Sequence, residues 1–225
     1  MTTRTDLTTR ADRRTARLAA VLFLVTWVTS VGALPLYGGS SYDPATRLAG
    51  RDSVLTASLL EVVLAVAVVG TSLALYPLLR AHGRGAALGY VALRGLEASV
   101  ILVGVVAVLP AVARPATTAA PGLSVDVVDG LRLVHDWTFL VGPGLINPVN
   151  ATVLAVLLWR RRLVPRFIPL LGLVGSVLVL GQNLAVMFGL TGTIAILVVP
   201  LFAWEISLAA YLLLRGIQPA HPTPR

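Results

Sequence analysis

Six long apolar runs, separated by short polar segments, constrain the fold of this chain more than any other feature. Each run has at least twenty residues, about the length that a helix needs to cross the hydrocarbon core of a bilayer. Because unpaired backbone groups are costly in lipid, such runs fold as helices. We therefore predict an all-α, polytopic membrane protein with a six-transmembrane-helix bundle. The predicted spans are residues 18–37, 54–79, 86–112, 134–158, 167–188 and 193–214.

The composition excludes a water-soluble protein. Of the residues, 56% are hydrophobic and only 12% are charged, whereas soluble domains carry about 25% charged residues. The net charge of +8 does not indicate a nucleic-acid partner, because the basic residues flank the apolar runs, as in membrane proteins. The chain has no cysteine, which excludes a disulfide framework and a thiol nucleophile. The expected partner is the lipid bilayer, and we expect no cofactor.

The two ends of the chain lie outside the predicted bundle. Residues 1–16 are rich in Thr and Arg, and we predict that they form a disordered cytoplasmic segment. Residues 17–215 are predicted to form the membrane domain, and residues 216–225 a cytoplasmic tail. The first apolar run also fits a signal peptide that is cleaved after residues 31–33. We expect the run to be retained, because it continues past that site and other spans follow.

Local patterns predict three further structural features. Residues 123–132 have helical spacing, which favours a helix along the membrane surface. Gly142, Pro143, Gly144 and Pro148 are expected to kink their span. Gly172 and Ser176 are small residues four positions apart, a spacing typical of close helix–helix contact in membranes.

The distribution of arginine predicts the orientation. Six spans put both termini on one side, and thirteen of the eighteen arginines lie on that side. Four lie on the opposite side, and Arg94 lies within a span. Because basic residues gather in cytoplasmic loops, both termini are predicted to be cytoplasmic. The use of arginine alone as the basic residue, with abundant Ala, Val and Leu, favours a bacterial cytoplasmic (plasma) membrane.

Ionisable residues within the predicted spans mark a polar centre. Arg94 and Glu97 are three residues apart, so they share a helix face and can form an ion pair. Ionisable groups at this depth cost roughly 2.5–3.5 kcal/mol each and usually face a bundle interior or a cavity. Glu61 and Glu205, the other two glutamates of the chain, also lie in apolar runs. We predict that these four residues converge.

More polar residues extend this set toward a pocket. Asp136 lies beside His135 at the outer end of its span, where we interpret the two as a solvated pair without metal-ligand spacing. The pocket is expected to open outward and to be closed toward the cytoplasm. The candidate binding residues are Glu61, Arg94, Glu97, Asp136, Asn147, Asn150, Gln182, Asn183 and Glu205, and the candidate catalytic residues are Glu61, Arg94, Glu97 and Glu205.

The predicted spans contain three glutamates but only one arginine, so at least one carboxyl group is predicted to lack a basic partner. A buried carboxylate without a partner takes up a proton rather than stay charged. We expect Glu61 or Glu205 to be protonated at neutral pH, because Glu97 has Arg94 beside it.

Motifs along most of the chain resemble one known family. They are Leu59-Leu60-Glu61, Leu75-Tyr76-Pro77-Leu78-Leu79, Gly89-Tyr90 through Arg94 and Glu97, Asp136-Trp137, Leu140 with Gly142-Pro143, Arg162 through Arg166, and Trp204-Glu205. In this combination the chain resembles a bacterial family of six-span membrane proteins catalogued as domain of unknown function 4386. The resemblance covers about residues 16–216 and implies the fold and topology, but no activity. The family often has an arginine where this chain has His135.

Three functions fit these observations. The first is a binding or transport-like protein whose pocket takes up a small or lipophilic molecule; six spans show no inverted repeat, but a homo-oligomer would supply one. The second is an intramembrane enzyme acting on a lipophilic, isoprenoid-like substrate, with Glu61 or Glu205 as general acid, Glu97 as base or stabiliser and Arg94 as orienting charge. The third is a structural or accessory subunit in which the polar set only packs the helices. We prefer the first.

The shape of the interior distinguishes these functions. A funnel that opens outward and ends at Glu97 favours binding or transport. A closed apolar cavity with one carboxylate favours the enzyme. An interior without a cavity, in which every carboxylate is bonded, favours the structural role.

Overall fold

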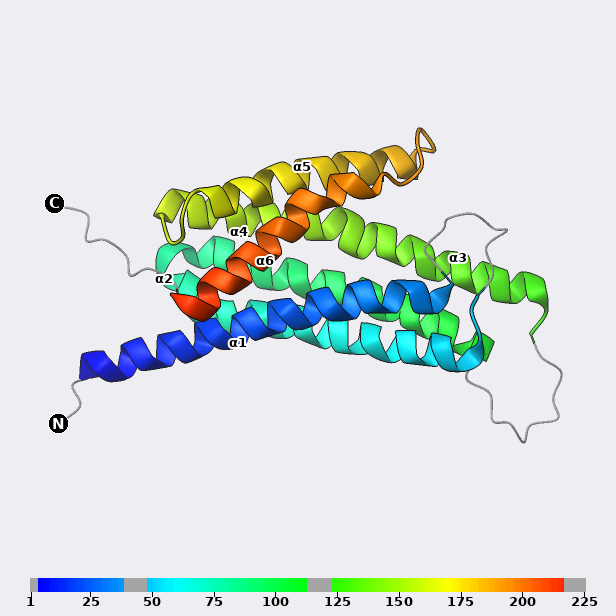
Figure 1. Cartoon of the computed structure of the whole chain (residues 1–225), viewed down its shortest axis with the longest axis horizontal. Helices are drawn as coiled ribbons and strands as arrows, with labels where there is room; N and C mark the ends of the chain where they lie inside the picture. The colour runs from blue at the N-terminus through cyan, green and yellow to red at the C-terminus, as the bar shows by residue number, and fades with distance from the viewer. Residues whose placement is uncertain (1–3, 39–47, 113–122, 217–225) are drawn as a thin grey trace.

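The computed structural model describes residues 4–38, 48–112 and 123–216, and every regular element within them is helical. Five helical segments are long and apolar enough to cross a membrane, which confirms an all-α protein suited to a bilayer. Figure 1 shows an elongated bundle. Its elements are α1 (Arg4–Ala33), η1 (Leu34–Tyr37), α2 (Arg51–Val112), α3 (Val125–Val141), η2 (Gly142–Ile146), α4 (Asn147–Arg161), α5 (Phe167–Met187), η3 (Ala195–Val198) and α6 (Val199–Leu214).

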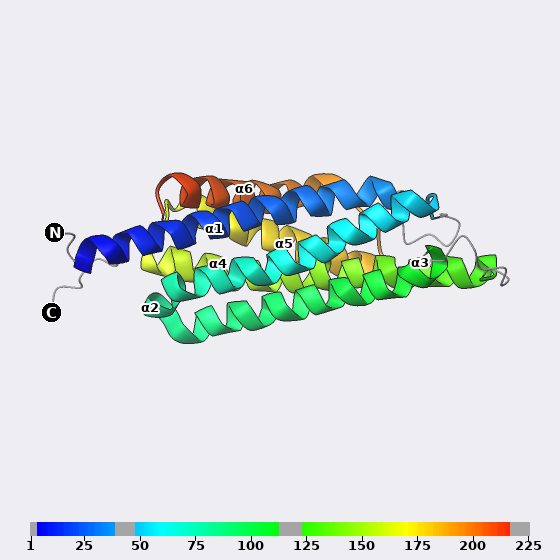
Figure 2. The same ribbon diagram turned by 90° about the horizontal axis from the view of Figure 1, so that it is seen from below.

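Helix α2 folds back on itself at Gly83. The backbone there is non-helical, with φ 176° and ψ 84°, and helix continues on both sides. Buried residues from before and after the break form one cluster, made of Leu64, Ala65, Val68, Ala98 and Ile101. This pattern requires two antiparallel arms, residues 51–82 and 84–112, which Figure 2 shows side by side. The predicted spans 54–79 and 86–112 are therefore both longer in the structure, and the expected turn around residues 80–85 is confined to Gly83.

One continuous helical segment from Val125 to Arg161 replaces the predicted span 134–158. Its start is capped by Ser124, whose hydroxyl accepts a hydrogen bond from the Val127 amide. The predicted helical structure is therefore confirmed from Val125 on, but these residues form the first turns of α3 and not a separate surface helix. The expected kink is present as the π-helical turn η2, since Pro143 has no N–H to donate to the regular pattern.

The other helices lie close to the predicted runs. α5 ends at Met187, one residue before the predicted span ends, and η3 with α6 covers residues 195–214. α1 begins at Arg4, so residues 4–16 are helical where the sequence predicts an irregular segment. Residues 1–3, and residues 217–225 of the predicted tail, lie outside the described residues.

Apolar side chains cover the outside of the bundle, and polar side chains lie within it. On the first arm of α2, the exposed residues Leu59, Val66 and Leu73 recur every seven positions, which places them on one face. On the same arm Ser58 and Glu61 are buried. A helix surface this apolar is suited to lipid and not to water.

The interior of the bundle has a solid part and a hollow part. The largest cluster of buried residues joins α1, α2, α4, α5 and α6, and it includes Ala19, Leu79, Leu158, Leu163 and Leu212. This solid part lies toward the end of the bundle that carries the start of α1, the Gly83 turn, residues 162–166 and the end of α6 (Figure 1). We call this the arginine end, because Arg80, Arg84, Arg160, Arg161, Arg162, Arg166 and Arg215 lie there. The polar residues of the candidate site lie toward the opposite end.

Candidate functional site

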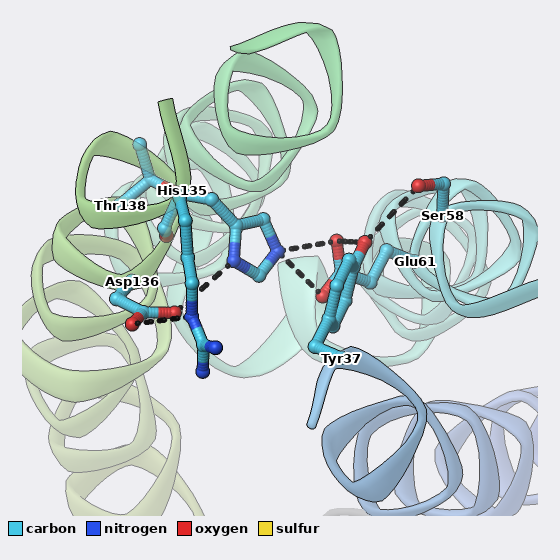
Figure 3. Close-up of polar contacts among 7 residues, drawn as sticks. Tyr37, Ser58, Glu61, His135, Asp136 and Thr138 are labelled. Atoms are coloured by element: carbon cyan, nitrogen blue, oxygen red, sulfur yellow. Dashed lines mark hydrogen bonds and ion pairs between the residues drawn. The ribbon is translucent and has the colours of Figure 1, made fainter. Parts of the chain in front are cut away.

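His135 lies on α3 with both of its ring nitrogens facing carboxylates (Figure 3). Nε2 lies 3.1 and 3.0 Å from the two carboxylate oxygens of Glu61 on α2, and Nδ1 lies 3.4 Å from Asp136 Oδ1. The Tyr37 hydroxyl donates a hydrogen bond to Glu61 Oε2 at 2.8 Å and lies 3.2 Å from Ser58 Oγ. The centroids of the Tyr37 and His135 rings are 4.2 Å apart. The end of the first span, α2 and α3 are therefore joined by buried polar contacts.

The arrangement around His135 requires a shared proton. A neutral imidazole donates from only one nitrogen, whereas an imidazolium donates from both. The carboxylates of Glu61 and Asp136 can therefore both accept a hydrogen bond from His135 only if its ring is an imidazolium. If the ring is neutral, one of the two carboxyl groups must itself carry a proton. Arg132, one turn before Asp136, places its Nε 3.5 Å from Asp136 Oδ2. We call Tyr37, Ser58, Glu61, Arg132, His135 and Asp136 the outer cluster.

The interpretation of His135 and Asp136 as a solvated surface pair is wrong. Their exposed fractions are only 4% and 5%, because α3 begins ten residues before His135 and carries both into the bundle. Arg132, which belongs to the helix predicted along the membrane surface (residues 123–132), is buried as well. The four-residue spacing of Arg132 and Asp136 is a local signal for this ion pair. Tyr37 has no such signal, since its partner Glu61 is 24 positions away.

Arg94 and Glu97 form the predicted ion pair on the second arm of α2. Arg94 Nη1 lies 2.9 Å from Glu97 Oε2, and both side chains are buried. Two amides of α4 complete the contacts: Asn147 Oδ1 accepts from Arg94 Nη1 at 3.2 Å, and Asn150 Nδ2 donates to Glu97 Oε2 at 2.7 Å. Asn147 and Asn150 are three residues apart and therefore face α2 together.

Glu205 on α6 approaches the same pair from another helix. It interacts electrostatically with Arg94, Glu97 and Asn147. In the described part of the chain, no basic side chain lies within ion-pairing distance of its carboxylate. It is half-buried, and it lines an internal cavity. We call Arg94, Glu97, Asn147, Asn150 and Glu205 the inner cluster.

A cavity of about 430 Å³ extends along both clusters. This volume lies in the range of small-molecule sites, about 300–1,000 Å³. The lining comes from α1 to α6 and is mostly apolar. The lining includes Leu34, Leu64, Val68, Ile101, Phe139, Val198 and Leu201, together with Trp27 and Phe202. The rings of Trp27 and Phe202 pack edge to face, with centroids 6.1 Å apart.

The cavity brings together nearly all of the predicted site residues. Those that line it are Glu61, Arg94, Glu97, Asp136, Asn147, Gln182, Asn183 and Glu205. Asn150 is the exception, because it is buried behind the cavity wall, where it bonds Glu97. Asn183 donates to the carbonyl oxygens of Gly144 and Val179, so it holds the π-helical turn against α5. Gln182 Oε1 and Trp27 Nε1 form no hydrogen bond to any described residue.

The expected convergence of three glutamates on Arg94 is only partly correct. Glu97 and Glu205 lie at Arg94, but Glu61 belongs to the outer cluster, where its basic partner is His135. The outer cluster lies roughly 12 Å further along the bundle at 1.5 Å per residue, since Glu61 is 22 positions from the Gly83 turn and Glu97 is only 14 positions from it. Of the described residues, no three His, Cys, Asp or Glu side chains are arranged to hold a metal ion.

Comparison with known proteins gives one match. A family described as "Domain of unknown function (DUF4386)" matches residues 18–216, which is most of the chain and includes both clusters. No curated protein and no solved structure matches the chain.

Proposed function

The chain belongs to the family described as domain of unknown function DUF4386, and because that description assigns no activity, we propose a function from the cavity. The protein is an integral membrane protein that binds or moves a small or lipophilic molecule. The observation that carries this proposal is the cavity of about 430 Å³, in which two polar clusters face predominantly apolar walls. Such a combination is typical of small-molecule sites, where apolar walls provide affinity and a few polar groups fix orientation.

The proposal includes a topology of six spans in a bacterial cytoplasmic membrane, with the two arms of α2 counted separately. The start of α1 and the end of α6 lie at the arginine end (Figure 1). Basic residues favour the cytoplasmic side, so this end faces the cytoplasm. The cavity then lies in the outer half of the bundle, and the solid core separates it from the cytoplasm.

The alternative functions have less support. A purely structural cluster would leave no space and would bond every polar group, whereas Glu205 has no ion pair and Gln182 Oε1 has no partner among the described residues. An enzyme with one acidic group would have a closed apolar cavity with a single carboxylate. This cavity has four, from Glu61, Glu97, Asp136 and Glu205, and it extends to Thr193 near the end of the bundle.

A binding assay with a cavity-filling variant tests this function. The protein in lipid nanodiscs is titrated with N-phenyl-1-naphthylamine, a neutral probe whose fluorescence rises in apolar sites, and empty nanodiscs supply the background. Val198 lines the cavity, so V198W is expected to weaken saturable binding at least tenfold. I196W is the matched control, because Ile196 lies on the same turn and is 69% exposed. Absence of saturable binding to the wild-type protein, or equal binding by V198W, would contradict the proposal.

A further inference from the structure

We infer that the ligand of this cavity is a lipophilic ammonium ion, whose charged nitrogen pairs with the carboxylate of Glu205. This inference rests on the proposed function and adds the chemical class of the molecule. It follows from the charges of the two clusters and from the walls of the cavity.

The charges of the outer cluster balance without a ligand. Glu61 and Asp136 are the two carboxylates, and Arg132 and His135 are the bases that contact them. An imidazolium at His135 donates from both nitrogens and makes this group neutral. The outer cluster therefore does not require a further cation.

The inner cluster has one carboxylate in excess. Arg94 is its single cation, and this guanidinium is held by Glu97 and Asn147. Glu205 is the second carboxylate, with no ion pair in the described part of the chain. An unpaired charge is costly in a low-dielectric interior, so this site favours the uptake of a positive charge: a proton on Glu205 while the cavity is empty, and a cation in place of that proton when a ligand binds. Because Glu205 faces the cavity, a ligand can supply that charge.

The walls beside Glu205 are suited to an organic cation. Phe202 lies three positions before Glu205 on α6, so both side chains share one face, and both line the cavity. Trp27 of α1 packs edge to face against Phe202. Aromatic faces attract cations within about 6 Å, and the apolar lining accommodates a hydrocarbon body.

The same geometry disfavours an anionic ligand. A carboxylate placed near Arg94 would find Nη1 already paired with Glu97 at 2.9 Å, whereas Nε, which has no acceptor among the described residues, is buried. It would also meet the like charge of Glu205. The site is therefore expected to distinguish ligands by their charge and to prefer cations to anions.

Three probes with one skeleton and different charges test the inference. 4-Phenylbutylammonium, 4-phenylbutanol and 4-phenylbutanoate each compete with N-phenyl-1-naphthylamine for the protein in nanodiscs. The ammonium is expected to bind at least tenfold more tightly than the alcohol, and the carboxylate more weakly than both. E205Q is expected to lower the affinity for the ammonium at least tenfold and to leave that for the alcohol within threefold. D126N, which removes an exposed carboxylate of α3, is the control and is expected to bind all three like wild type.

The outcomes separate this inference from the proposed function. Equal affinities for the ammonium and the alcohol, or an unchanged ammonium affinity in E205Q, would overturn the inference and leave the binding function standing. Tightest binding of the carboxylate would assign recognition to Arg94 instead. Saturable binding of the fluorescent probe without displacement by any competitor would also overturn the inference. Loss of all saturable binding would overturn the proposed function itself.

Discussion

At the residue scale, the two glutamates of the inner cluster differ in how their charge is compensated. Glu97 pairs with Arg94 and accepts a hydrogen bond from Asn150. Glu205 interacts with the side chain of Asn147 and, at longer range, with the charge of Arg94, but it forms no ion pair within the described residues. Glu97 is therefore expected to stabilise the fold, whereas Glu205 is kept at a cost to stability, as is common for functional residues.

Neutralising each glutamate in turn tests this difference. E97Q leaves Arg94 buried without its carboxylate, and breaking a buried pair on one side costs roughly 3–5 kcal/mol. E205Q loses no ion pair, so we expect its stability to equal or exceed that of the wild-type protein. Thermal unfolding of both variants in the same detergent measures the difference. If E205Q unfolds as readily as E97Q, Glu205 is a structural member of the cluster.

Only polar contacts between residues that are close in the sequence can be predicted from it. Arg94 and Glu97 are three positions apart on one helix, so any helical structure brings them together. Glu61 and His135 are 74 positions apart, and their contact depends on how α2 and α3 pack. For this reason the ion pair was predicted, whereas His135 was misinterpreted as a surface residue.

At the element scale, small residues set the distance between α5 and α6. Gly172 was predicted to lie in a packing face, and a Cβ at this position would collide with the ring of Trp204. Gly175, one turn along, was not predicted, and a Cβ there would collide with the backbone of Leu201. Close approach of the two backbones places Glu205 and Phe202 of α6 beside the cavity.

Alanine substitutions at two glycines of α5 test this packing. G175A forces α6 away from α5, and overpacking of this kind costs about 1–3 kcal/mol. G181A is the matched control, because no atom lies within 4 Å of a Cβ built there. In the control, alanine is expected to raise stability by up to about 1 kcal/mol through its helix propensity. Thermal unfolding provides the readout, and an equal effect of both substitutions would contradict the packing described here.

Helix boundaries were predicted less well than helices. The hydropathy of residues 134–158 predicts a span, but α3 begins earlier, at Val125. Its start is stabilised because Ser124 caps the helix and because Arg132 pairs with Asp136 within the bundle. Similarly, Gly83 alone interrupts α2. Ion pairing and capping allow a helix to continue through polar residues that hydropathy would assign to loops.

At the scale of the whole molecule, the proposed orientation makes the cavity accessible from outside the cell. The solid core lies toward the arginine end, and the cavity lining extends to Leu34 and Thr193 near the other end. The protein is thus expected to exchange its ligand with the outer side or the outer leaflet. A shallow apolar groove lined by Val100, Val134 and Trp137 on the outer surface of α2 and α3 is expected to contact lipid.

Single cysteines test the orientation and the cavity together, because the chain has no cysteine of its own. A membrane-impermeant methanethiosulfonate is added to intact cells. S30C, in the cavity lining, is expected to react from outside. V66C is expected not to react, because Val66 is 67% exposed on an apolar face of the bundle that is expected to contact lipid. R161C at the arginine end is expected to react only after permeabilisation. Reaction of R161C in intact cells would reverse the orientation, and an unreactive S30C would show that the cavity is closed to water.

The helical fold, its suitability for a membrane and the Arg94–Glu97 pair follow from patterns within single segments of the sequence. Hydropathy and three-residue spacing are local properties, and a helix preserves them whatever it packs against. Other features depend on contacts among different segments. They are the pairing of Glu61 with His135, the lack of an ion pair at Glu205 among the described residues, and the cavity along the two clusters. Such contacts are set by the packing of glycines, aromatic rings and buried charges across helices, and they were therefore defined only when the helices were assembled.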